Sequence, residues 1–88
     1  LSPGEFLEVV VPAPAGSSFA ALNVAAVDPT GAGFLTVRPC ADVDGESSTL
    51  NFAAGANVAN VAIVDASGPV CVSVSIETHV LVDLVAAG

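Results

Sequence analysis

The chain has 88 residues, which suits a single domain with one small hydrophobic core. Nine Asp and Glu residues against one Lys or Arg give a formal net charge of −8, which argues against nucleic acid and anionic lipid as partners because both are bound through Lys and Arg. Although 53% of the residues are hydrophobic, charges, prolines and glycines interrupt every run of about 18 residues, so the sequence excludes a membrane-spanning helix.

Short apolar runs separated by turn residues predict seven β-strands and no helix. The runs are rich in Val, and several alternate between apolar and polar side chains, as strands with one buried face do. Asp, Gly and Pro, which favour turns, fill the segments between them. In chain order the predicted strands are Phe6–Val11, Phe19–Val27, Gly33–Arg38, Thr49–Ala53, Val58–Val64, Val70–Ile76 and His79–Val85.

This spacing of strands predicts an all-β fold, a small antiparallel β-sandwich or a barrel-like sandwich. Residues 1–88 are expected to form one module. The chain begins at Leu1 rather than at an initiator Met, and we expect it to be a segment of a larger exported protein.

Two cysteines, Cys40 and Cys71, lie 31 positions apart without a neighbouring His or further Cys to complete a zinc site. The two cysteines could form a disulfide with each other or remain as two buried free thiols, and we favour the disulfide. A bridge closing a loop of that length stabilises a fold by about 3.5–4 kcal/mol in the chain-entropy model. A disulfide also predicts an oxidising, extracytoplasmic location, either secreted or on the cell surface.

His79 and Asp83 are the pair that most suggests catalysis. On a strand they share one face but lie about 13 Å apart, too far for the hydrogen bond that joins a base to the group that orients it. No serine of the sequence lies in a nucleophile elbow. We therefore expect no enzyme, and we keep His79 only as a ligand-binding candidate.

The segment Asp42-Val43-Asp44-Gly45-Glu46 resembles the start of a calcium loop. Its carboxylates could bind one hard cation, but an EF-hand also needs a Glu at its twelfth position, which counted from Asp42 is Ala53. We favour a solvated loop and no cofactor. A calcium site formed by Asp42, Asp44 and Glu46 is the alternative.

Three asparagines, Asn23, Asn51 and Asn60, lie among apolar residues of predicted strands. A buried amide is unfavourable unless it is hydrogen-bonded. We favour bonds that hold a neighbouring loop or bulge, and ligand binding is the alternative.

Aromatic platforms for stacking on sugars are expected to be absent. The chain contains no Trp or Tyr, and its four Phe residues fall in predicted strands, where we expect them in the core. A glycan site would therefore have to be polar, with or without calcium.

Several segments of the chain together resemble a repeat module of actinobacterial secreted and cell-surface proteins. The segments are Leu22–Val24, Pro29–Thr30, Gly33–Cys40, Ser48–Phe52, Gly55, Ala59–Asn60, Val70–Val72 and Thr78–Asp83. The resemblance covers residues 1 to 85 and implies an all-β fold with Cys40 paired to Cys71. Such modules accompany secreted hydrolases or stand in tandem, and the resemblance implies no active site.

Three functions follow as expectations. The first is a noncatalytic structural, adhesive or spacer module of a secreted or surface multidomain protein, whose partner is an extracellular protein. The second is a module that binds glycan or cell-wall material, with or without calcium. The third is self-association through uncovered apolar runs such as Phe6–Val11 and Val58–Val64, because an open strand edge is a template for pairing.

Overall fold

The computed structural model of the chain describes residues 1–41, 48–66 and 68–88. Their seven strands coincide with the seven predicted runs, with ends that differ by at most two residues, and the described residues contain no helix. The strands are β1 (Phe6–Val9), β2 (Phe19–Val27), β3 (Gly33–Pro39), β4 (Ser48–Phe52), β5 (Val58–Asp65), β6 (Val70–Val74) and β7 (His79–Ala87).

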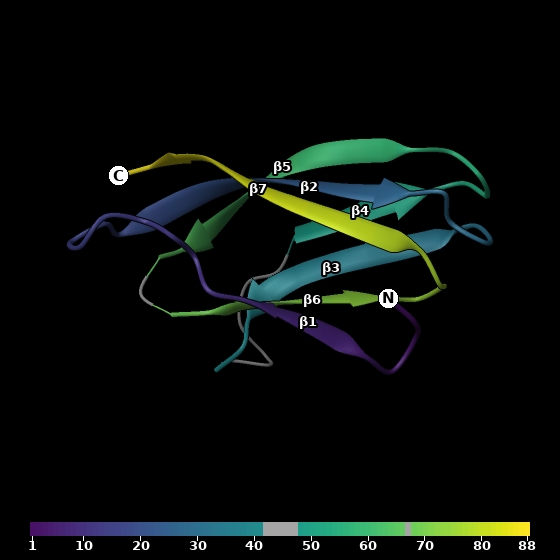
Figure 1. The fold of residues 1–88 in the computed structure, drawn as a ribbon, viewed down its shortest axis with the longest axis horizontal. Coiled ribbons are helices and arrows are strands. Elements are labelled where there is room, and N and C mark those ends of the chain that lie inside the picture. Colours follow the sequence, from purple (N-terminus) through teal and green to yellow (C-terminus); the bar gives the residue numbers. More distant parts are fainter. Residues whose placement is uncertain (42–47, 67) are drawn as a thin grey trace.

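Two antiparallel sheets form the fold, which confirms the all-β prediction. One sheet has the strand order β1-β6-β3-β4 and the other the order β5-β2-β7. In Figure 1, β2, β5 and β7 occupy the upper part of the view, and β1, β3 and β6 the lower part. Among the described strands, β3 and β4 are consecutive neighbours in one sheet, whereas every other consecutive pair is divided between the two sheets.

The core lies between the sheets and follows the two-residue period of the strands. Even-numbered residues of β2 face it, and Leu22 is almost fully buried. From the other sheet come Leu35 and Val37 of β3 and the alternating valines of β6, beginning with Val70. The small β-branched and alanine side chains that dominate the sequence thus fill a thin apolar layer.

A disulfide joins Cys40 to Cys71, as expected, with an S–S distance of 2.10 Å. Cys71 lies in β6, and Cys40 follows directly after β3, the neighbouring strand. The backbone N–H of Cys40 also donates to the carbonyl oxygen of Pro69 at 3.1 Å. The bridge therefore connects the two central strands of the four-stranded sheet.

The expectation that all four Phe side chains lie in the core is wrong for three of them. Phe52 is buried, but Phe6, Phe19 and Phe34 are exposed. The cause is the strand period, because Phe34 alternates with the buried Leu35 and so points away from the core. Inward positions are taken mainly by Val, Leu and Ala.

Candidate functional site

The outer face of the three-stranded sheet exposes several large apolar side chains. We call it the outer β2 face, and define it by nine residues that the register places in three rows. Across β5, β2 and β7 the rows are Ala59, Ala25 and Leu81; Val61, Asn23 and Asp83; and Ile63, Ala21 and Ala86.

The large apolar side chains of the outer β2 face are open to solvent. Val61 is 50% exposed, Ile63 62% and Leu81 58%. All three belong to the flanking strands, whereas the central strand β2 contributes only the small side chains of Ala21, Asn23 and Ala25. Large exposed apolar patches mark interaction sites in proteins, and here the apolar side chains flank Asn23 and Asp83.

Charge is sparse on the outer β2 face. Asp83 lies in its middle row, and Asp65 borders it at the end of β5. The other carboxylates of the described residues, those of Glu5, Glu8, Asp28 and Glu77, lie on β1 or on loops. Protein interfaces are depleted of charge at their core, and Asp83 in the middle row departs from that pattern.

A polar pocket of about 260 Å³ lies at the start of β7. Its lining residues are Leu1, Asp28, Thr30, Glu77, Thr78 and His79. Thr78 holds the pocket together, since its Oγ1 lies 3.1 Å from the carbonyl oxygens of Val27 and His79. The N-terminus is also bonded to this residue, because the amino group of Leu1 donates a hydrogen bond to the carbonyl oxygen of Thr78 at 2.8 Å.

Hydrogen bonds connect the segments that line this pocket. The N–H and hydroxyl groups of Thr30 both donate to the carbonyl oxygen of Glu77, each at 3.0 Å. Asp28 has a positive φ of 51°, and its N–H donates to Asn57 Oδ1 at 2.8 Å. These bonds position the pocket's polar groups, which could hydrogen-bond a small polar ligand.

His79 and Asp83 face the same side of β7, as the sequence predicts, but they do not meet. His79 is opposite Val27, Asp83 is opposite Asn23, and Leu81 lies between them. Four residues of strand separate them by about 13 Å. His79 therefore lines the polar pocket, while Asp83 belongs to the outer β2 face.

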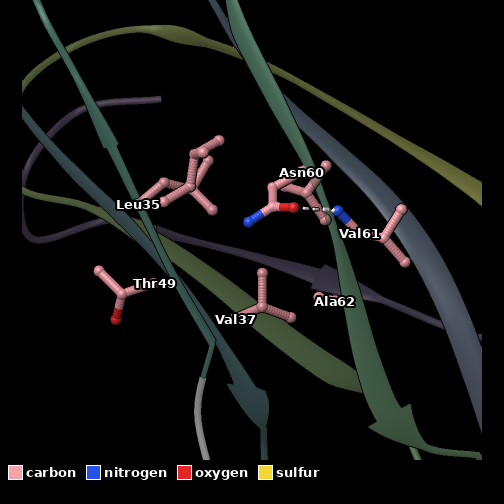
Figure 2. Close-up of a pocket in the computed structure, with 8 residues that line it drawn as sticks. Leu35, Val37, Thr49, Asn60, Val61 and Ala62 are labelled. Carbon is pink, nitrogen blue, oxygen red and sulfur yellow. Dashed lines mark hydrogen bonds between the residues drawn. The ribbon is translucent and has the colours of Figure 1, made fainter.

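The three asparagines lie on three different surfaces. Asn23 is at the centre of the outer β2 face, and Asn51 is opposite Phe34 on the outer side of β4. Asn60 lines a small pocket of about 20 Å³ with residues such as Leu35 and Val37, as Figure 2 shows. Such a volume is close to that of one water molecule.

The side chain of Asn60 bonds to its own strand. Its Oδ1 accepts a hydrogen bond from the backbone N–H of Val61 at 2.9 Å (Figure 2). This bond joins two consecutive residues of β5, and the expected bond to a neighbouring loop or bulge stays a prediction. The structure does not bring Asn23, Asn51, Asn60 and His79 into one site.

The predicted calcium ligands Asp42, Asp44 and Glu46 lie outside the described residues, so that site stays a prediction. Within residues 1–41, 48–66 and 68–88, no group of three or more His, Cys, Asp or Glu side chains is placed to hold a metal ion.

A surface that the sequence interpretation missed is the outer side of the four-stranded sheet. Phe6 and Phe34 are exposed there, on the same side as Thr36, Ser73 and Asn51. The alternation of Phe34 and Thr36 with buried Leu35 and Val37 was a signal that could have identified it.

Comparisons with protein-family models, with curated proteins and with solved structures found no match to this chain. The likeness to actinobacterial surface modules therefore stays a prediction. No helix in the described part of the chain is long and apolar enough to cross a membrane.

Proposed function

We propose that the chain is a noncatalytic structural or adhesive module of an exported multidomain protein, and that it works by protein contact through the outer β2 face. The observation that supports this most is the exposure of Val61, Ile63 and Leu81 around Asn23. Leaving such side chains in water is unfavourable by roughly 25 cal/mol for each Å² of apolar surface. A partner that covers them gains that energy.

The Cys40–Cys71 disulfide supports export, because such bonds form and persist in oxidising compartments. It also fits a small domain that must remain folded outside the cell, where one thin core contributes limited stability. On the residue pattern given above, we place the module among the repeats of actinobacterial secreted and surface proteins.

The absence of catalysis can be tested with panels of glycoside, ester and peptide substrates. We expect the protein to give no turnover above that of the His79→Ala and Asp83→Ala variants. Reproducible turnover that disappears in either variant would refute the proposal, since it would assign chemistry to residues that we place on two separate surfaces.

A second candidate function is glycan binding on the outer side of the four-stranded sheet. It is favoured by the exposure of Phe6 and Phe34 beside the hydroxyl groups of Thr36 and Ser73. Aromatic rings offer apolar faces, and neighbouring hydroxyl and amide groups can bond to a polyol. This replaces the expectation that only a polar site could bind sugar.

Glycan arrays followed by calorimetry test this second function. Phe34→Ala is expected to lose binding, whereas Phe19→Ala, an exposed Phe on the other sheet, is expected to retain it. Repeating the titration with a chelator tests the calcium alternative at Asp42, Asp44 and Glu46. An array with no bound glycan would remove this candidate.

A further inference from the structure

We infer that β1 is a detachable strap, which opens between Gly4 and Gly16 while the rest of the sandwich stays folded, and which covers the edge of β6 when it is closed. This inference goes beyond the proposed function and does not depend on it. It is drawn from the burial of β1, from the two glycines that flank it and from the directions of the backbone hydrogen bonds of β6.

β1 is the most weakly held of the described strands. None of its four residues is buried, and Phe6 and Leu7 are 59% and 40% exposed. It pairs only with β6, through four register pairs. β7 also lacks a buried residue, but eight register pairs join it to β2. Segments with few buried contacts open at a lower free energy than the core does.

Two glycines flank β1 and can act as its hinges. Gly4 and Gly16 both have a φ of 87°, and a Cβ atom at either position would meet nothing within 4 Å. Hinges are a few residues at the ends of an element that absorb the change in φ and ψ, and they are often small. The chain is fixed on both sides, since Leu1 and Thr78 exchange two backbone bonds and Phe19 begins β2.

The closed strap protects the edge of β6. Val9 and Val11 pack against the buried core, so closure is the resting state. Without β1, the edge of β6 would present unpaired backbone groups, which are a template for pairing with another chain. β1 is a poorer template, because it is short and because Pro12, which cannot donate to a ladder, follows soon after it.

The amides of β6 point alternately to its two neighbours. In an antiparallel pair, opposite residues alternate between hydrogen-bonded and non-bonded pairs. Ser75 N–H donates to the carbonyl oxygen of Phe34 at 2.9 Å, so two residues further on, Ser73 is also in a bonded pair with β3. The amides of Ser73 and Cys71 therefore face β3. Those of Val72 and Val70 face β1.

Native-state amide hydrogen exchange, followed residue by residue with NMR, tests the strap within this one strand. We expect the two β1-facing amides to exchange faster than the two β3-facing amides. Their exchange should also depend less on denaturant, because opening the strap exposes less surface than global unfolding does. Equal exchange of all four amides, with equal dependence on denaturant, would overturn the inference, since β1 would then open only with the whole fold.

A matched pair of glycine variants tests the hinge. Ala is strained at a positive φ, and Gly55, between β4 and β5, also has a positive φ and no atom within 4 Å of an added Cβ. Gly16→Ala loses its strain when the strap opens, so the β1-facing amides should exchange about five- to thirty-fold faster. Gly55→Ala keeps its strain in the opened state, and should accelerate only the β3-facing amides. Acceleration of all four amides by Gly55→Ala, or of none by Gly16→Ala, would contradict the hinged strap.

Discussion

Gly33 lies at the closest approach between β3 and the end of β6. A methyl group added there would lie 2.6 Å from Ser75 Oγ and 3.0 Å from Ile76 Cγ2. Ser75 cannot easily move away, because its Oγ accepts a hydrogen bond from the backbone N–H of Phe34 at 2.8 Å. The strand pairing at this point therefore depends on the absence of a side chain.

Gly33→Ala is accordingly expected to lower the free energy of unfolding by about 1–3 kcal/mol, the usual range for overpacking. Gly68→Ala is the control, because a methyl group there meets no atom within 4 Å. Denaturant unfolding of the two variants measures the difference. Equal stability would show that Ser75 and Ile76 can make room.

Thr78 is the second residue on which local structure depends. It is 2% exposed, and its hydroxyl lies between the carbonyl oxygens of Val27 and His79. A hydroxyl removed from such a place leaves a buried carbonyl without its partner. The polar pocket beside His79 is held in shape by this one side chain.

Thr78→Val, which keeps the shape but removes the donor, is expected to destabilise the protein by about 1–3 kcal/mol. Thr49→Val, at an exposed position of β4, should change stability much less. Thermal melts of both variants make the comparison. If the two melting temperatures fall alike, the Thr78 hydroxyl does not have the role assigned to it.

At the scale of the strands, the sequence predicted where each strand lies but not which strands pair. The period of two is local, and it indicated which runs form strands. Pairing is not local in this protein, since β1 joins β6 and β2 joins both β5 and β7. Apolar composition alone also misplaced three Phe residues, because composition does not tell inward positions from outward ones.

The candidate site was less predictable than the fold. Asn23, Asn51, Asn60 and His79 are each in the predicted strand, but only the sheet register shows that they face different surfaces. The outer β2 face combines residues from β2, β5 and β7, and no sequence pattern joins Val61 to Leu81. Its apolar character becomes visible only once the three strands are side by side.

The Cys40–Cys71 bond connects β3 with β6, and its removal is expected to weaken the whole sandwich. The double variant Cys40→Ala with Cys71→Ala should lose about 3.5–4 kcal/mol of stability in the chain-entropy model. Unfolding with and without reductant provides the measurement, since the reductant should lower the stability of the wild type and leave the variant unchanged. A wild type that is insensitive to reductant would contradict this role for the bond.

At the scale of the whole molecule, a net charge of −8 coexists with an outer β2 face that has one carboxylate in its nine positions. Net charge of this size keeps copies apart in solution.

The most direct test of the central claim, that this module is noncatalytic, is to compare the wild type with the His79→Ala and Asp83→Ala variants on panels of glycoside, ester and peptide substrates. We predict that the wild type gives no turnover above that of either variant. Reproducible turnover that disappears in either variant would contradict the claim.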